Sequence, residues 1–165
     1  MLDSLSHTVG ISSALGVLDG DKVVYLARSA SFEILSPIFN SGRCMPIYCS
    51  AIGLMLLALK SQEEREFYIG HTKLLAYTNN TVTQTDELRK ILDDARANGY
   101  VYSSSWIGAE YSSLAVPVVD TSGTYVAGMS VIVPNRKIQA KSIVTRYLPA
   151  LSRAAKELGG MLFPA

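Results

Sequence analysis

The chain has 165 residues, of which 48% are hydrophobic and 18% charged, and its formal net charge is +1. This length and apolar content indicate one compact domain with a buried core and exclude a disordered chain. The near-neutral charge argues against a surface for nucleic acid or anionic membrane, and no apolar run approaches the length of a membrane span.

The N-terminal sequence and the cysteines indicate a compartment. Residues 1–6 lack the basic and then apolar pattern of a signal peptide. Cys44 and Cys49 are the only cysteines and share one apolar segment, so we expect buried, reduced thiols in a cytoplasmic protein. Because the chain begins inside a weak helix predicted over residues 2–9, we expect a domain taken from a longer chain.

Three strands are predicted after this first helix. Residues 11–18 and 22–28 favour two strands joined by Asp19-Gly20, a frequent hairpin turn. Residues 32–39 favour a third strand, which Pro37 restricts to a sheet edge or a bulge.

A short apolar helix is predicted at the centre of the chain. Pro46 breaks regular structure, Ser50 is a suitable N-cap, and the helix extends to about Lys60. Its almost uniformly apolar surface predicts burial. The first turn leaves the N–H groups of Ala51 and Ile52 without helical partners, and the helix dipole favours an anion there. The stretch predicts either a seat for a small carboxylate or a core helix capped by Ser50 and water.

Two helices, three strands and a last helix follow. Residues 62–70 favour a helix, and Thr85 is expected to cap an amphipathic helix that ends at Gly99. The final helix follows residues 134–135 and is expected to bend at Pro149. The strands are expected at residues 100–104, 114–119 and 125–133, with a hairpin turn at 120–123. This order predicts an α+β domain in which helices cover an antiparallel sheet.

The sequence contains no pattern typical of a metal site or a reaction centre. His7 and His71 lie far apart without ligand-spaced partners, which favours surface or packing roles. Cys44 and Cys49 match neither the C-x-x-C redox spacing nor a zinc pattern. G-x-S-x-G and glycine-rich phosphate loops are absent. We therefore expect no metal, no cofactor and no enzyme activity.

Serine and aromatic residues cluster near the predicted strand ends. They are Ser103, Ser104, Ser105, Ser112 and Ser113, together with Tyr48, Tyr102, Trp106 and Tyr111. These side chains either line a cavity or are polar loop ends and core aromatics with polar tips.

Several sequence runs occur in a characteristic order between residues 5 and 164. They are residues 17–26 (VLDGDKVVYL), 45–53 (MPIYCSAIG), 81–83 (TVT), 88–100, 115–120 (AVPVVD) and 126–131 (VAGMSV). Together they resemble the effector-binding domain of IclR-type bacterial transcription regulators. The MPIYCSAIG run is most similar to the branch that controls aromatic-acid and ketoadipate catabolism.

The resemblance implies a GAF-like (profilin-like) fold, a curved antiparallel β-sheet flanked by helices with a small-molecule pocket on one face. It implies that residues 1–165 form the effector-binding domain and that an N-terminal winged helix-turn-helix domain is absent from this chain. It further implies homodimers or homotetramers that reach DNA only through the missing domain and make no membrane contact.

The resemblance also implies the position of the effector. Its acid group would lie at the start of the central helix, and Pro37 would help to close the pocket. The implied site residues are Met45, Tyr48, Ser50, Ala51, Ile52, Ser103, Trp106, Ser113, Ser130 and Ile132.

The sequence departs from the family pattern near this site. Residues 108–113 (GAEYSS) lack the usual arginine, and Glu110 stands where glycine is common. An aspartate often found near the pocket is Ser103, and a second strand hydroxyl after Ser130 is replaced by Ile132. The site is therefore expected to be more apolar than one for pyruvate or glyoxylate.

Two other functions are compatible with the same fold. Cys44 and Cys49 would suit a GAF-type thiol enzyme, such as a free methionine sulfoxide reductase. Glu110 and Ser112 would suit a domain that has lost its ligand and only mediates oligomerisation.

Overall fold

The computed structural model describes residues 1–29, 42, 44–106, 110–134 and 139–162. Within these ranges the chain forms helices, one short 3-10 turn (η2) and the strands of a single sheet. In chain order they are α1 (Leu2–Val9), β1 (Ser12–Asp19), β2 (Lys22–Ser29), β3 (Cys44–Pro46), η2 (Ile47–Cys49), α2 (Ala51–Ala58), α3 (Gln62–His71), α4 (Thr85–Asn98), β4 (Val101–Ser104), β5 (Tyr111–Val119), β6 (Tyr125–Pro134) and α5 (Ala140–Leu162).

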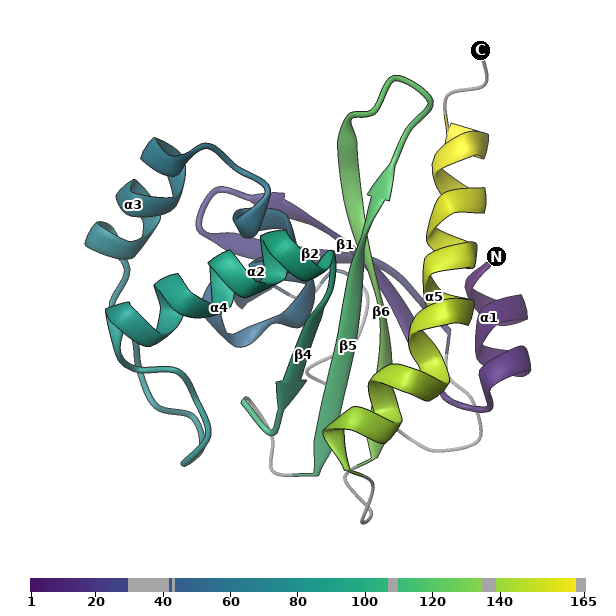
Figure 1. The fold of residues 1–165 in the computed structure, drawn as a ribbon, viewed down its shortest axis with the longest axis horizontal. Helices are drawn as coiled ribbons and strands as arrows, with labels where there is room; N and C mark the ends of the chain where they lie inside the picture. Colours follow the sequence, from purple (N-terminus) through teal and green to yellow (C-terminus); the bar gives the residue numbers. More distant parts are fainter. Residues whose placement is uncertain (30–41, 43, 107–109, 135–138, 163–165) are drawn as a thin grey trace.

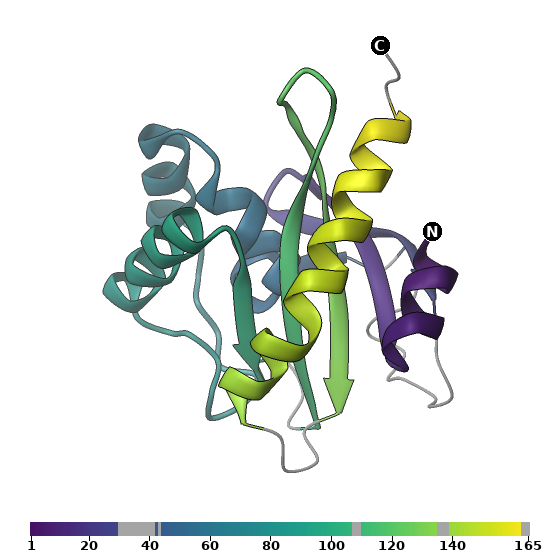
Figure 2. The ribbon, with the colours of Figure 1, turned by 45° about the vertical axis from the view of Figure 1, so that its right-hand side comes forward.

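Among the described residues the sheet has six strands in the order β3-β2-β1-β6-β5-β4, and every neighbouring pair is antiparallel. Helices α1 and α5 pack on one face, whereas α2 packs on the other with α4 outside it (Figures 1 and 2). Each face of the sheet therefore has its own hydrophobic core. This arrangement confirms the predicted α+β fold. None of the described helices has the length and hydropathy needed to cross a bilayer.

Helix α2 is buried along its whole length, as predicted from its composition. Gly16 of β1 pairs with Gly128 of β6, and Ile52 packs over both glycines. A Cβ added at Gly128 would lie only 2.7 Å from Ile52 Cγ2. The absence of side chains at the two glycines thus allows the start of α2 to pack closely against the sheet.

Helix α5 packs on the opposite face through a stripe of residues with helical spacing. Its buried residues are Ile143, Tyr147, Leu151, Ala154, Ala155 and Gly159, and the helix continues through Pro149. A Cβ at Gly159 would lie 1.8 Å from the carbonyl oxygen of Val119 on β5. The last turns of α5 can therefore approach the strand backbone only because this residue is glycine.

Strand β3 was not predicted from the sequence. The strand predicted at residues 32–39, with Pro37, falls outside the described residues and stays a prediction. Among the described residues, β3 pairs with β2 at the end of the strand order. Pro46 was expected to break regular structure before it and to hold Met45 extended; Met45 is extended as expected, but the residues before Pro46 form a strand instead of being irregular. Proline is compatible with an edge strand because its missing N–H leaves no ladder hydrogen bond unmade.

Two local predictions were also wrong. Gln84 is the N-cap of α4, without a side-chain cap hydrogen bond, and Thr85 is the first helical residue, followed by Asp86 and Glu87 in the first turn. Cys44 is exposed, because it lies on a short edge strand, whereas Cys49 is buried as expected.

Candidate functional site

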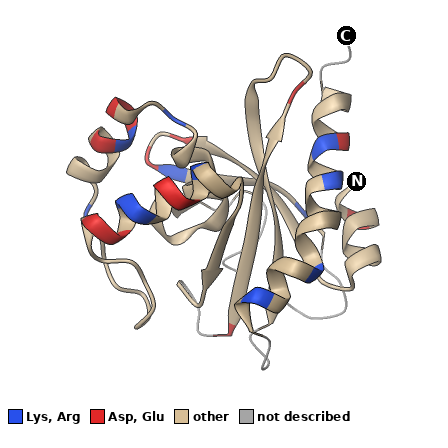
Figure 3. Cartoon of the chain, in the orientation of Figure 1, with Lys and Arg blue, Asp and Glu red and all other residues tan. Residues whose placement is uncertain are grey.

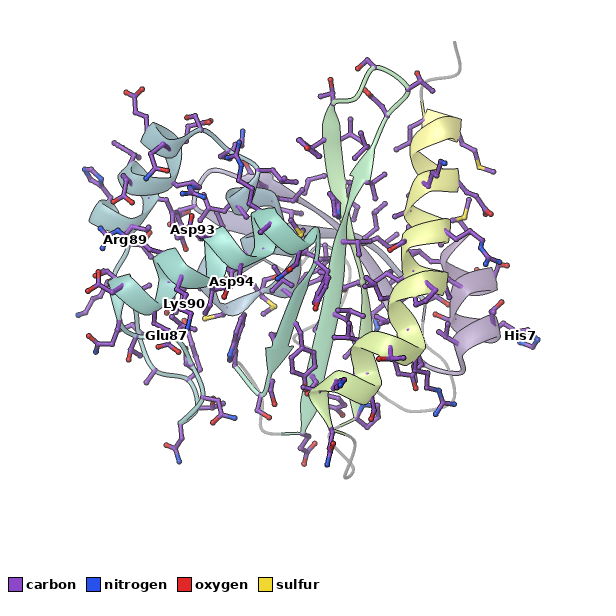
Figure 4. The ribbon with its side chains drawn as sticks, in the orientation of Figure 1. His7, Glu87, Arg89, Lys90, Asp93 and Asp94 are labelled. Atoms are coloured by element: carbon purple, nitrogen blue, oxygen red, sulfur yellow. The ribbon has the colours of Figure 1, made fainter. Side chains whose placement is uncertain are left out.

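A cavity lies in front of the N-terminus of α2. Among the described residues it is lined by Tyr25, Met45, Cys49, Ser50, Ala51, Ser103, Trp106, Tyr111, Ser112 and Ser113. None of these side chains carries a formal charge at neutral pH. The charged residues labelled on α4 lie on the outer surface of the molecule, as does His7 on α1 (Figures 3 and 4).

Ser50 caps α2 at the cavity, which confirms the predicted N-cap. Its Oγ accepts a hydrogen bond from the Gly53 amide at 3.2 Å, and its carbonyl accepts one from the Leu54 amide at 2.9 Å. The amides of Ala51 and Ile52 have no acceptor within α2 because they precede the first helical hydrogen bond. Their N–H groups and the positive end of the helix dipole make this a favourable position for an anion.

Tyr25 brings a second hydroxyl to the same position. Its phenolic oxygen lies 3.4 Å from Ser50 Oγ, and both residues are buried. Burial raises the pKa of Tyr25, and the Ser50 hydrogen bond opposes this effect. The Tyr25 hydroxyl therefore stays protonated at neutral pH and can donate a hydrogen bond to an acid.

Cys49 lies in the η2 turn between β3 and α2. Burial raises the pKa of its thiol to about 12, although a hydrogen bond with Tyr48 lowers it in part. The thiolate is the reactive form of cysteine. The raised pKa therefore disfavours the Cys49 thiolate at neutral pH, which is unfavourable for a nucleophile at this position.

The wall formed by Trp106 is held by a segment that the sequence analysis did not include in the site. The Thr78 and Thr81 hydroxyls donate to the carbonyl oxygens of Ser105 and Trp106, respectively. Ser105 has a positive φ of 57°, and its amide donates to the Tyr111 carbonyl at 3.0 Å. The only sequence signal for this support was the Thr-Val-Thr run of the family resemblance.

The sheet side of the cavity is built from small residues. Ser113 pairs with both Ser103 and Ile132, and the next row pairs Ala115 with Ser130. The Ser113 hydroxyl donates to the Val131 carbonyl at 3.3 Å. Small side chains leave the larger aromatic residues to define the shape of the space.

The structure brings six of the ten predicted site residues to the cavity. They are Met45, Ser50, Ala51, Ser103, Trp106 and Ser113. Tyr48, Ile52, Ser130 and Ile132 are buried nearby but are absent from the described lining. The Tyr48 hydroxyl instead donates to the Leu75 carbonyl at 3.0 Å and accepts from the Leu75 amide at 2.9 Å.

Tyr25 and Cys49 line the cavity although the sequence analysis did not propose them for the site, whereas Tyr111 and Ser112 were named there only in the cluster with two possible roles. Alternation along residues 22–28 was the available signal for Tyr25, since it places Tyr25 on the same face as buried Val23. Of the residues that depart from the family pattern, Ser112 is buried at the cavity and Glu110 is exposed. Pro37 falls outside the described residues.

The cavity is small as it stands. Its volume is about 20 Å³, which is room for about one water molecule. The chamber expected in front of α2 is narrow because Met45, Tyr25, Trp106 and Tyr111 surround it. An aromatic acid requires some of these side chains to move.

A larger hollow of about 410 Å³ lies at the opposite end of α2. It is lined by Val17, Leu18, Leu56, Leu59, Lys60, Ser61, Glu64, Thr124, Tyr125 and Val126. The Glu64 carboxylate there accepts from the Ser61 amide and pairs with Lys60. The negative end of the α2 dipole points toward this hollow, so a small acid is favoured at the N-terminal cavity instead.

The comparison with protein families assigns the chain to a family. Residues 1–159 match the family described as "Bacterial transcriptional regulator IclR C-terminal". The chain belongs to this family. The resemblance predicted from sequence is thereby confirmed, and the IclR family consists of transcription regulators, not of enzymes.

A curated relative supports the same assignment. The chain is 29% identical over 163 residues to the Pca regulon regulatory protein of Pseudomonas putida, which covers 98% of this chain. The chain spans 56% of the length of that relative.

Two solved structures of similar fold contain aromatic acids. One is the inducer-binding domain of a double mutant of PobR from Acinetobacter with 3-hydroxybenzoic acid, at TM-score 0.90 and 25% identity over 97% of this chain and 94% of that one. The other is an IclR homolog from Microbacterium hydrocarbonoxydans with 4-hydroxybenzoate, at TM-score 0.85 and 27% identity over 98% of this chain and 64% of that one. The chain is thus an effector-binding domain of the IclR type.

Proposed function

We propose that this domain senses a small organic acid, in the first instance an aromatic one, at the N-terminus of α2. The observation that carries the proposal is the buried, uncharged niche where Tyr25 and Ser50 meet the first amides of the helix. The hydroxybenzoates in the two related structures support the aromatic class.

In the proposed complex, the effector carboxylate accepts hydrogen bonds from the amides of Ala51 and Ile52. The hydroxyls of Ser50 and Tyr25 complete this seat. The hydroxyls of Ser103, Ser113 and Ser130 on the sheet form hydrogen bonds with other polar groups of the effector. The apolar body of the effector contacts Met45 and Trp106 of the lining, and it reaches Tyr48 and Ile132 only after the side chains in front of them have moved.

The proposal for the whole protein follows from the family. An N-terminal winged helix-turn-helix domain would bind DNA in the cytoplasm, and the effector domains would form a homodimer or homotetramer. The effector can act only by binding two arrangements of the subunits with different affinity. The DNA-binding domains would report which arrangement is populated.

A thermal-shift screen against aromatic and short-chain carboxylic acids tests the proposal, with calorimetry on the acids that respond. A ligand at 100 times its Kd stabilises the folded state by about 2.7 kcal/mol, which raises the Tm by several degrees. Ser50→Ala combined with Ser130→Ala should weaken binding while the far-ultraviolet circular dichroism stays native. Unchanged affinity would remove these two residues from the site.

The small volume of the cavity favours a second candidate, a domain without ligand that only mediates oligomerisation. This candidate predicts that no acid in the screen shifts the Tm while sedimentation still shows self-association. A Tm shift with an aromatic acid, lost in the double serine variant, would exclude it.

A further inference from the structure

Arg28 lies on the face of the sheet that contains the cavity. It pairs with Ala14 of β1, Ala14 pairs with Ser130 of β6, and Ser130 pairs with Ala115 of β5. Directly opposed residues of antiparallel strands project to the same face. Ala14 and Ala115 belong to the core beneath α2, which assigns Arg28 to that side of the sheet as well.

The neighbours of Arg28 in this row have small side chains. Ala14 offers only a methyl group beside it, and Ser130 only a hydroxymethyl group. A long side chain on β2 can therefore extend over Ala14 toward the middle of the sheet. Arg28 is half-buried, and its charge interacts with Tyr111, a residue of the cavity wall.

Burial lowers the pKa of Arg28, and the interaction with Tyr111 opposes this effect. An arginine nevertheless keeps its charge throughout the physiological range. The described lining of the cavity contains no Asp, Glu, Lys, Arg or His. Arg28 is thus a permanent cation on the sheet face that contains the cavity, and the described cavity lining itself carries no formal charge.

Strand β2 contributes Tyr25 near the N-terminus of α2, where the carboxylate is proposed to bind, and Arg28 at a different position further along the strand. Tyr25, which contacts Ser50, is opposite Gly16, whereas Arg28 is opposite Ala14, two residues further along β1. Two residues of strand correspond to about 6.6 Å. This is on the scale of a small ring with polar groups at opposite ends.

We propose that Arg28 is a specificity-determining residue of the effector site, which favours acids with a second oxygen-bearing group at the end opposite the carboxylate. This inference rests on the proposed function. The carboxylate occupies the seat at Ser50 and Tyr25, and Arg28 donates hydrogen bonds to the distal hydroxyl or carboxylate oxygen. A hydrogen bond from a charged donor then separates such acids from the corresponding monoacid.

The test is calorimetry with benzoate, 4-hydroxybenzoate and benzene-1,4-dicarboxylate on three proteins. Wild type should bind the two disubstituted acids at least about tenfold more tightly than benzoate. Arg28→Met should abolish this ratio with little change in the affinity for benzoate, and Arg28→Lys should restore part of it. Lys22→Met, an exposed charge change on the same strand, should preserve the wild-type ratio.

The outcomes separate the two proposals. If wild type binds none of the three acids nor any other acid of the screen, the proposed function fails. If wild type binds benzoate but has no preference, or if Arg28→Met weakens all three acids equally, the assignment of Arg28 is overturned and the effector site stands.

Discussion

The hydroxyl of Tyr25 on β2 lies 3.4 Å from the Oγ of Ser50, the N-cap of α2. This contact joins the first hairpin to the only helix end that opens on the cavity among those described. A displacement of Tyr25 on β2 would therefore alter the hydrogen bonding of Ser50 at the start of α2, where we propose that the acid binds.

Ser50→Ala should lower the free energy of unfolding by about 1 kcal/mol through loss of the cap and should also weaken acid binding. Ser61→Ala is the matched control, because Ser61 caps α3 in an exposed capping box away from the cavity. Urea unfolding and calorimetry on both variants check this. Equal losses of acid affinity would show that the cap acts on stability alone.

Gly128→Ala should destabilise the domain by about 1–3 kcal/mol, because the new methyl group would overlap Ile52. Ile52→Ala should cost about 2–5 kcal/mol through the cavity that it leaves. The double variant should cost less than the sum of the two, because removing the Ile52 methyl relieves the overlap. A double-mutant cycle by urea unfolding measures this coupling, and additive effects would contradict the close contact.

Gly159→Ala should cost at least about 3 kcal/mol, because its Cβ would collide with the Val119 carbonyl and the backbone cannot give way cheaply. The neighbouring Gly160 is exposed, and a methyl group added there would have no neighbouring atom within 4 Å. Gly160→Ala should therefore stabilise the helix by about 0.5–1 kcal/mol. Thermal unfolding of the pair should move the Tm in opposite directions.

The buried Cys49 thiol should make the domain less stable at alkaline pH. Its pKa in the folded state is about 12, above the ordinary value of 9.0, so between these values the unfolded chain releases a proton that the folded chain retains. The free energy of unfolding must then fall as pH rises above 9, by up to about 1.4 kcal/mol per pH unit from this group.

The Cys49→Ala variant lacks this titrating thiol, so its free energy of unfolding should fall less between pH 8 and pH 10 than that of the wild type. Urea unfolding at both pH values compares the two proteins. The buried tyrosines are present in both and cancel in the comparison. Parallel pH dependence would show that the Cys49 thiol titrates normally in the folded domain.

The sequence was sufficient for those elements whose structure depends on local pattern. The apolar run after Ser50 could only be a buried helix, and Asp19-Gly20 between alternating runs marked the first hairpin. Strand β3 was missed because three residues beside a proline show no period, and its existence depends on pairing with β2.

The site was predictable only in part, for a related reason. Ser50 and Ala51 could be placed because helix geometry fixes what surrounds an N-cap. Tyr25 and Tyr111 reach the cavity through strand register and through the Ser105 turn. These are long-range features, so local alternation and clustering show which face a side chain occupies but not which residues meet in the cavity. The positions of Tyr48 and Ile132 behind the lining depend on side-chain packing, which spacing alone does not reveal.

The one-water volume of the cavity has a thermodynamic consequence for any guest. An acid the size of benzoate binds only those molecules in which some of the side chains of Met45, Tyr25, Trp106 and Tyr111 have moved out of the cavity. The apparent Kd therefore exceeds the intrinsic Kd by the inverse of the fraction of such open molecules. A smaller residue in place of Trp106 would increase the fraction of open molecules and would also weaken the direct contacts between the protein and the acid. Binding of the acid would then itself be the conformational change, since every molecule with bound acid is in the open conformation.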